Sequence, residues 1–326
     1  MNWWSLGVAA LVLAGCGSSG ESGTTAAGGA GGSGGDKKIV MGFCQIGGAN
    51  EWRVANTKSA QDAAKEAGIE LKLSDGQDKQ ENQIKAMRAF IAQGVDVIVL
   101  SPVVETGWEP VLQEAKKAQI PVIIADRKPD ASEDLYVTVI SSDYVKEGEM
   151  AAEWLAKKTD DKATIAEIAG TPGSAPANDR HKGFETILAK HPGMKVVFSQ
   201  SGEWNVAKGK ETTEAMLKSA VGKTVNTVFA HNDDMALGAI QAIQEAGRKP
   251  GTEVIVISID GTKKAFEAMK DGTLNCTVEC NPLTGPQLMS TAKEILAGKT
   301  VEKRITYKDA VWEMEQAAAE LPNRKY

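Results

Sequence analysis

The chain is poor in the residues that mark several common classes of protein. Its 326 residues include only three histidines and four cysteines, and its acidic residues outnumber the basic ones, giving a formal net charge of -6. A protein that binds nucleic acid usually carries a basic face, so this charge argues against one. No histidine or cysteine has a partner at the spacing of a zinc site, so we expect neither a metal nor another cofactor. After the first residues, no apolar run is long enough to cross a bilayer.

The N-terminal segment has the composition of a targeting signal followed by a linker. A short apolar stretch ends in Leu13-Ala14-Gly15-Cys16, which resembles the lipobox of bacterial lipoproteins, although no Lys or Arg precedes it. Residues 17–36 are mostly Gly, Ser, Thr and Ala, and such a segment behaves as a flexible coil. We therefore expect a signal peptide over 1–16, lipidation of Cys16, a tether over 17–36 and an extracytoplasmic protein that touches the membrane only through its lipid. The alternative is an apolar N-terminus with a chance cysteine.

The rest of the chain alternates between strand and helix patterns. Such βαβα alternation predicts a parallel, doubly wound sheet, and it restarts near residue 140. About 290 residues exceed what one hydrophobic core supports. We therefore predict an α/β fold of two doubly wound parallel-sheet lobes joined by hinge crossings, with lobes 37–140 plus 282–307 and 141–281 plus 308–326. The expected strands are 39–43, 69–73, 95–100, 121–125, 136–140, 164–168, 195–199, 225–230, 254–259, 274–279 and 304–307. The expected helices are 53–67, 78–93, 107–118, 143–158, 175–190, 206–221, 233–246, 263–270 and 286–296.

Three apolar strands end directly in charged or amide residues. Asp126-Arg127, His231-Asn232-Asp233-Asp234 and Asp260-Gly261 each follow such a strand. In open α/β sheets the ligand crevice lies beyond the carboxyl ends of the strands. A carboxylate accepts two hydroxyl hydrogen bonds and a guanidinium donates in a fixed fork, which suits the vicinal diol of a sugar.

Each of these strand ends also has a purely structural interpretation. Asp126 and Arg127 could form an ion pair that caps a loop, and Asp260-Gly261 could be a turn. We expect Asp233 to be the N-cap of the next helix and Asn232 to be the ligand residue. A zinc site at His231 is disfavoured because no partner lies at ligand spacing.

One arginine and two tryptophans stand close to the same predicted crevice. Arg180 lies early in the helix after the 170–174 loop, which lacks the GxxxxGK[ST] motif of a phosphate loop. Trp52, beside Arg53, and Trp204 lie in polar loop contexts, and the C–H face of a sugar packs on an indole. Trp108 begins a helix, and core or lobe packing fits it as well as a role in the site.

The remaining cysteines, Cys44, Cys276 and Cys280, have no metal-type spacing. In an extended strand Cys276 and Cys280 would lie about 13 Å apart, too far for a disulfide. We expect buried thiols, although an exported protein permits a bridge.

Several motifs together resemble the type I periplasmic sugar-binding proteins of ABC transporters. They are Ile123-Ile-Ala-Asp-Arg127, Phe229-Ala-His-Asn-Asp-Asp-Met-Ala-Leu-Gly-Ala239 and Ile259-Asp-Gly261. Glu51-Trp-Arg53, Asp75-Gly-Gln77 with Lys79-Gln-Glu-Asn-Gln83, and Thr106-Gly-Trp-Glu-Pro110 are most similar to the galactofuranose-binding branch. Two departures from the family pattern, Glu51 before the tryptophan and Trp204 at a variable aromatic position, leave the sugar itself undetermined.

The resemblance implies a periplasmic-binding-protein-like I fold, a monosaccharide ligand such as galactofuranose, an ABC transporter permease as partner, and a monomer. It also implies the ligand contacts, which are Trp52, Arg53, Asp126, Arg127, Arg180, Trp204, Asn232 and Asp260. Glu279 or Asn281, at an expected lobe crossing, is a further one.

Other functions compete with this interpretation. An enzyme could use Asp126 and Asp260 as acid and base, but Arg127 and Arg180 would hold such carboxylates ionised, so we expect no enzyme. The ligand-sensing core of a transcription regulator would need a basic helix-turn-helix before residue 37, where the Gly/Ser tether lies instead. A sensor that presents its sugar to a chemoreceptor or sensor kinase differs from a transport protein only in its partner, so both remain open.

Overall fold

The computed structural model describes residues 38–48 and 50–326. Cys16, the predicted signal peptide and the tether lie outside the described residues. Within the described part, no helix has both the length and the apolar character needed to cross a membrane.

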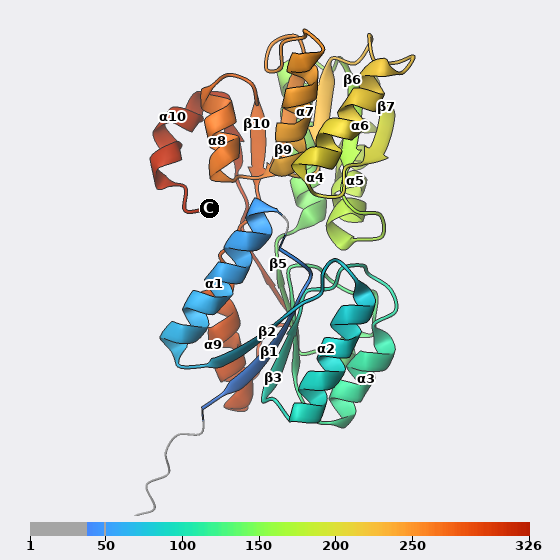
Figure 1. The fold of residues 1–326 in the computed structure, drawn as a ribbon. Helices are drawn as coiled ribbons and strands as arrows, with labels where there is room; N and C mark the ends of the chain where they lie inside the picture. The colour runs from blue at the N-terminus through green and yellow to red at the C-terminus, as the bar shows by residue number, and fades with distance from the viewer. Residues whose placement is uncertain (1–37, 49) are drawn as a thin grey trace, which may run out of the picture. The chain divides into compact units, whose positions relative to one another are not determined.

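The first lobe is built on a six-stranded sheet in the order β11-β5-β4-β3-β1-β2, and all of its pairings are parallel (Figure 1). Its strands are β1 (Val40–Gln45), β2 (Glu70–Asp75), β3 (Val97–Leu100), β4 (Val122–Ala125), β5 (Thr138–Ser141) and β11 (Arg304–Thr306). Its helices are α1 (Glu51–Ala67), α2 (Gln80–Gln93), α3 (Glu109–Lys117) and α9 (Gly285–Leu296), with a short 3-10 turn, η1 (Glu133–Leu135). Helices α1 and α9 pack together on one face of the sheet, and α2 and α3 pack on the other.

The second lobe repeats this plan with the strand order β12-β10-β9-β8-β6-β7. Its strands are β6 (Ala163–Ala169), β7 (Met194–Ser201), β8 (Thr227–Ala230), β9 (Ile255–Asp260), β10 (Cys276–Glu279) and β12 (Val311–Glu313), of which only β12 is antiparallel to its neighbour. Its helices are α4 (Tyr144–Thr159), α5 (Ala175–Leu188), α6 (Val206–Lys218), α7 (Asp233–Glu245), α8 (Lys263–Lys270) and α10 (Ala317–Glu320), with two 3-10 turns, η2 (Met314–Gln316) and η3 (Leu321–Asn323). The predicted fold of two parallel-sheet α/β lobes is confirmed.

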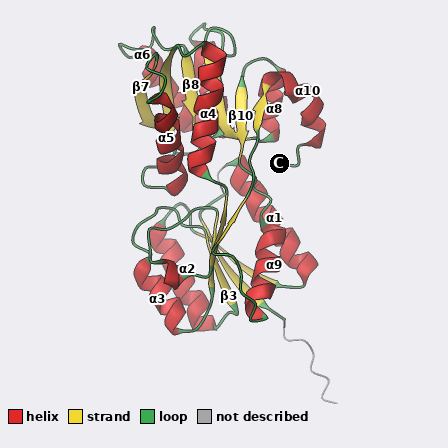
Figure 2. Cartoon of the chain, turned by 180° about the vertical axis from the view of Figure 1, so that it is seen from behind, coloured by secondary structure: helices red, strands yellow, loops and turns green. Residues whose placement is uncertain are grey.

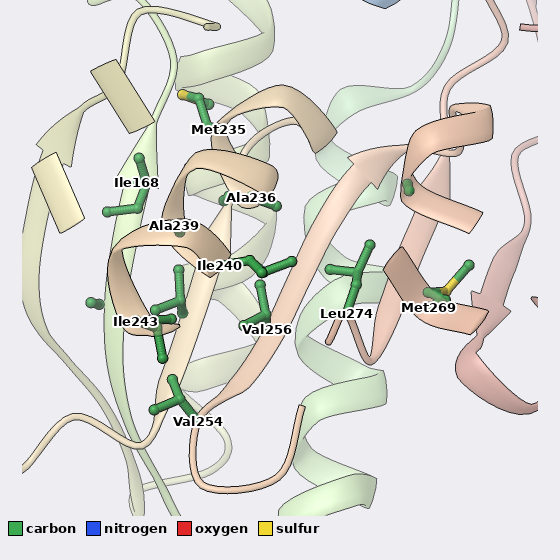
Figure 3. Packing of buried hydrophobic residues seen from close by; sticks show 14 of the residues in the cluster. Ile168, Met235, Ala236, Ala239, Ile240, Ile243, Val254, Val256, Met269 and Leu274 are labelled. Carbon is green, nitrogen blue, oxygen red and sulfur yellow. The ribbon is translucent and has the colours of Figure 1, made fainter. Parts of the chain in front are cut away.

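The apolar strands are buried on both faces, which is why they appear in the sequence as continuous apolar runs. Successive side chains of a strand point to opposite faces. In β9, for example, Val256 belongs to the cluster beneath α7, whereas Ile257 belongs to the cluster beneath α4 and α5. Figure 3 shows the first of these clusters, where Ile240 and Ile243 of α7 pack beside Val256. Each lobe therefore has a core on both sides of its sheet.

The chain passes between the two sheets at residues 142–143, 280–284 and 307–310 (Figure 2). These three segments join β5 to α4, β10 to α9, and β11 to β12. The chain adds one edge strand to each sheet last, β11 to the first sheet and β12 to the second. Each lobe is therefore completed by a segment that lies late in the sequence.

Several helices begin at a different residue from the predicted one, because of their local backbone structure. Helix α1 begins at Glu51 because the side chain of Asn50 caps it by accepting from the N–H of Arg53. Helix α2 begins at Gln80 and not at 78, because Asp78 has a left-handed backbone with φ of 57°. Helices α1 and α2 end at Gly68 and Gly94, which have a left-handed backbone that glycine adopts without strain. Strand β12 was not predicted.

The three cysteines of the described part, Cys44, Cys276 and Cys280, are free and buried. This confirms the expectation of buried thiols. Trp108 is fully buried in the core of the first lobe, which decides between the two roles left open for it.

Candidate functional site

A cavity of about 300 Å³ lies where the carboxyl ends of the central strands of both sheets meet. We call it the inner chamber. It brings together eight of the nine residues predicted to bind a ligand, namely Trp52, Arg53, Asp126, Arg127, Arg180, Trp204, Asn232 and Asp260. It is also lined by four residues that were not predicted, namely Asn50, Tyr144, Pro176 and Cys280.

Asp126 is the centre of the first lobe's half of the chamber. It follows β4 on a left-handed backbone with φ of 65°, and its carboxylate accepts from Nη2 of Arg53 at 2.5 Å. Arg127 Nε lies 3.7 Å from the same carboxylate. Burial alone would raise the pKa of Asp126, but the two guanidinium groups outweigh it and hold that pKa below its usual value. Asp126 is therefore an ionised acceptor facing the cavity.

Arg127 connects the chamber to the loop after β3. Its Nη1 donates to the carbonyl oxygen of Val103 at 3.1 Å, and burial lowers its pKa to about 10, so it stays charged at neutral pH. Its guanidinium carbon lies 5.4 Å from the ring centroid of Trp204 in the other lobe. Its Nε makes no hydrogen bond within the described part of the chain. Arg127 thus brings an unused donor to the boundary between the lobes.

Tyr144 links the two halves of the inner chamber. It is the first residue of α4, just after the first crossing, and its buried hydroxyl donates to the carboxylate of Asp126. Burial, together with the nearby charge of Asp126, raises the pKa of Tyr144 well above its usual value, so the phenol keeps its proton. The sequence offered one signal for it, an aromatic residue directly after the N-cap Asp143 at the expected join of the lobes.

Arg180 is the centre of the second lobe's half of the chamber. Its Nε donates to Glu147 Oε2 at 2.7 Å, and its Nη1 donates to the carbonyl oxygen of His231 at 2.5 Å. Both Arg180 and Glu147 are buried. Helices α4 and α5 approach closely here because residue 148 is glycine, where a Cβ would lie 2.1 Å from the carbonyl oxygen of Arg180. This close packing holds the guanidinium beside Glu147.

Asp260 faces Arg180 from the end of β9. Their closest atoms, Oδ1 and Nη2, are 3.8 Å apart, and the Asp260 carboxylate has no hydrogen bond within residues 50–326. Burial raises the pKa of Asp260 well above its usual value, with Arg180 acting in the opposite direction. Its φ of 134° departs from strand geometry. An acid held in this way, with little internal pairing, is available to a ligand.

Trp204 closes the chamber from the loop between β7 and α6. Its ring lies against Gly170, where a Cβ would be only 1.9 Å from the indole, so only glycine leaves room for it. The guanidinium of Arg180 lies 5.7 Å from the ring centroid. Trp204 Nε1 is buried and unpaired among the described residues, whereas Trp52 Nε1 donates to the carbonyl oxygen of Cys280 at 2.6 Å. One indole is thus fixed by the hinge segment, and the other keeps a free donor.

The prediction that Asp233 is the N-cap of α7 is wrong. Asn232 is the N-cap of α7, with Oδ1 accepting from the N–H of Met235 at 3.0 Å, and it also lines the chamber. Asp233 is the first helical residue and is buried. Its carboxylate accepts from four groups of the β9 and β10 region, namely Ser258 Oγ, Thr262 N–H, Thr262 Oγ1 and Thr277 Oγ1. The one-residue error arises because either side chain can cap a helix.

Glu279 lies outside the inner chamber. Its carboxylate accepts from Arg324 Nη2 at 2.9 Å, Tyr326 Oη at 3.1 Å and Trp312 Nε1 at 3.2 Å. Glu279 therefore ties the C-terminal segment to β10, and the structure does not bring it to the other candidate residues.

His231 takes part in a buried network beneath the chamber. Its Nε2 lies 2.9 Å from Glu167, which also accepts from His181 and Ser199. Burial would raise the pKa of Glu167, but His231, Ser199 and His181 together outweigh it and hold that pKa at about 2. Among residues 38–48 and 50–326 there is no cluster of side chains suited to a metal ion.

Comparison with known proteins adds to this geometry. Residues 41–300 match the family model described as a periplasmic binding protein domain. The chain belongs to the periplasmic binding protein family. The galactofuranose-binding protein YtfQ of Escherichia coli (strain K12) is 44% identical over 291 residues, which cover 88% of this chain and 92% of that protein.

Two solved structures share the fold of this periplasmic binding protein. The binding component of the arabinose ABC transporter from Shewanella sp. ANA-3, bound to alpha- and beta-L-arabinofuranose, is 46% identical with a TM-score of 0.86, covering 88% of this chain and 96% of its own. A protein from Mycobacterium smegmatis in complex with beta-D-fucofuranose is 46% identical with a TM-score of 0.86, covering 88% and 95%.

Proposed function

We propose that this periplasmic binding protein captures one monosaccharide in its furanose form in the inner chamber and delivers it unchanged to an ABC transporter. The observation that carries the proposal is the lining of the chamber. Carboxyl groups, guanidinium groups and indoles reach it from both lobes at once. A ligand there therefore contacts both lobes and stabilises their closed arrangement.

The chamber offers what a hydroxyl-rich, uncharged ring requires. Asp126 and Asp260 supply acceptors, while Arg127 Nε and Trp204 Nε1 supply donors that have no hydrogen bond among the described residues. Sugar hydroxyls both donate and accept, and indole faces pack on their C–H groups. Hydrogen bonds to charged groups contribute roughly 1.5–3 kcal/mol each, so a few of them give selective binding.

The lobes also touch each other directly beside the chamber. The N–H of Glu105, in the first lobe, donates to the carbonyl oxygen of Gly173, in the second, at 2.9 Å. On another side, the N–H of Glu51 donates to Asp234 Oδ2 at 3.1 Å. Hinge closure around a ligand needs a closed state that the ligand favours, and these bonds supply part of its stability. A permease that recognises the closed lobes would then distinguish loaded from empty protein.

The furanose form and the transport role are supported by the relatives. One similar protein binds galactofuranose, and two similar structures hold arabinofuranose or fucofuranose. One of these structures is a component of an arabinose ABC transporter.

A ligand screen tests the proposal. Purified protein is heated with L-arabinose, D-galactose, D-fucose, D-ribose and D-glucose, and a sugar present at a thousand times its Kd should stabilise the fold by about 4 kcal/mol and raise Tm. Titration calorimetry gives the affinity, and 13C NMR of the bound, labelled sugar distinguishes furanose from pyranose rings. No response to any of these sugars, or a bound pyranose, would contradict the proposal. Conversion of the sugar during the incubation would point to an enzyme.

We further propose that Cys16 carries a lipid that holds the protein at the membrane. The Leu13-Ala14-Gly15-Cys16 sequence and the Gly/Ser segment after it support this anchor. Cys16→Ser should move the protein from the detergent phase to the aqueous phase in a Triton X-114 partition of whole cells. Ser19→Ala, in the same segment, is the matched control and should stay in the detergent phase. A Cys16→Ser protein that also stays there would contradict the anchor.

A further inference from the structure

A second cavity adjoins the inner chamber and opens outward between the two lobes. Its volume is about 850 Å³. We call it the outer chamber. The two chambers share a neck formed by Asn50, Arg53, Arg127 and Trp204. The rest of the outer wall consists of Ile46, Gly47, Asp78, Thr171, Pro172, Glu203 and Asn205. A molecule seated in the inner chamber therefore lies next to a larger space with its own lining.

The outer wall has the chemical character of a site for hydroxyl groups. Asp78 and Glu203 face it from opposite lobes, and neither carboxylate forms a hydrogen bond or ion pair with other residues of the described part. Thr171 and Asn205 add a hydroxyl and an amide, and Trp204 and Pro172 add apolar surface. Two carboxylates disfavour an anionic ligand such as a phosphate, whereas they accept hydrogen bonds from neutral hydroxyls.

The backbone at both acids is held in a conformation that non-glycine residues rarely adopt. Asp78 has a φ of 57° and Glu203 a φ of 50°. Of the nine described non-glycine residues with positive φ, five line one of the two chambers, namely Asp78, Asp126, Glu203, Trp204 and Asp260. Such residues cluster where a structure positions side chains for a ligand. The outer chamber shares this property with the inner one.

The neck between the chambers suits a glycosidic oxygen. The guanidinium carbon of Arg127 lies 5.4 Å from the ring centroid of Trp204 there. Arg127 Nε and Trp204 Nε1 have no hydrogen bond among the described residues, and both groups donate and never accept. An ether oxygen linking two sugar rings accepts and never donates. A linkage that passes through the neck would therefore accept from two buried donors that have no hydrogen bond within the described part of the chain.

From these observations we infer that the protein also binds furanosyl disaccharides, with one ring in the inner chamber and the second, hydroxyl-rich ring in the outer chamber against Asp78 and Glu203. This inference rests on the proposed function, because the inner ring occupies the monosaccharide site. The substrate class of that site is then furanosides that carry a further sugar unit as well as free furanoses.

The test compares a monosaccharide with its own disaccharide by titration calorimetry. The monosaccharide is the one that binds in the screen above. The disaccharide consists of two furanose rings of that same sugar, linked through the exocyclic or terminal hydroxyl. For L-arabinose it is α-1,5-L-arabinobiose. Either ring of this probe can enter the inner chamber, so the result does not depend on which end of the sugar faces outward.

The variant Asp78→Asn/Glu203→Gln keeps the shape of both side chains and removes their charge. We expect it to weaken disaccharide binding about tenfold and to leave monosaccharide binding within about twofold. The control Asp160→Asn/Glu153→Gln removes an acid from a left-handed backbone position and another from an exposed helix face, and neither residue lines a chamber. It should change neither affinity.

Two results would overturn the inference while the proposed function stands. One is a monosaccharide that binds and a disaccharide that does not. The other is an Asp78→Asn/Glu203→Gln variant that weakens both ligands equally or neither. If no sugar of either size binds, the proposed function itself fails.

Discussion

Replacing Asp260 by Ala should abolish sugar binding, with a loss of affinity of at least about 100-fold. Losing two hydrogen bonds to sugar hydroxyls and leaving those hydroxyls buried without a partner costs about 3–6 kcal/mol together, which corresponds to that loss or more. The fold should survive, because the Asp260 carboxylate makes no hydrogen bond to other described residues and its neighbour Arg180 keeps Glu147 as partner. Titration calorimetry measures the affinity, and thermal unfolding followed by circular dichroism checks the fold.

The control for this experiment is Asp271→Ala, which removes an exposed acid at the end of α8. It should leave the affinity unchanged. If Asp260→Ala binds sugar as tightly as the parent protein, Asp260 does not contact the ligand. Asp126 is a less direct test, because its loss would leave the buried Arg53 without its carboxylate partner and would disturb the fold as well as the site.

The largest effect on stability is expected from Glu147→Ala. Glu147 is fully buried, and its partner Arg180 is almost so, with their closest atoms 2.7 Å apart. Removing one partner of a buried ion pair leaves an uncompensated charge and costs about 3–5 kcal/mol. For a protein of this size that lowers Tm by about 10 °C. Sugar binding should weaken too, because Glu147 holds the guanidinium in the chamber.

Glu153→Ala provides the comparison on the same helix. Glu153 is exposed and lies 3.8 Å from Lys146, so its loss should change the stability by no more than about 0.5 kcal/mol. Thermal and urea unfolding of both variants measure the difference. A Glu147→Ala protein as stable as Glu153→Ala would mean that the pair contributes nothing to the fold.

The sequence was sufficient to locate the chamber because of one topological rule. Ligands of open parallel sheets bind beyond the carboxyl ends of the strands, and Asp126 and Asp260 stand at such ends. Tyr144 was missed because it reaches the chamber from a crossing between lobes, and no strand-end pattern marks a crossing. Its contact with Asp126 exists only once both lobes have folded.

Glu279, which the family resemblance implied as a ligand contact, lies outside the chamber. It pairs in register with Asp260, which suggests a shared direction. Yet Asp260 has left strand geometry, with φ of 134°, whereas Glu279 remains within β10 and the next residue, Cys280, lines the chamber. Because side chains alternate along a strand, Glu279 points elsewhere, toward Arg324. Because Arg324 is far from Glu279 in the sequence, no pattern in the residues around Glu279 predicts this salt bridge.

The order in which the chain supplies its strands has a consequence for biogenesis. The edge strands β11 and β12 are both drawn from residues 304–313, yet one completes the first sheet and the other the second. A chain that emerges from its N-terminus, whether from the ribosome or through a membrane, therefore cannot finish either lobe until almost all of it has appeared. The first lobe must wait with an open sheet edge while the second is still being delivered. Both lobes of such a chain are therefore completed together, at the end of its delivery.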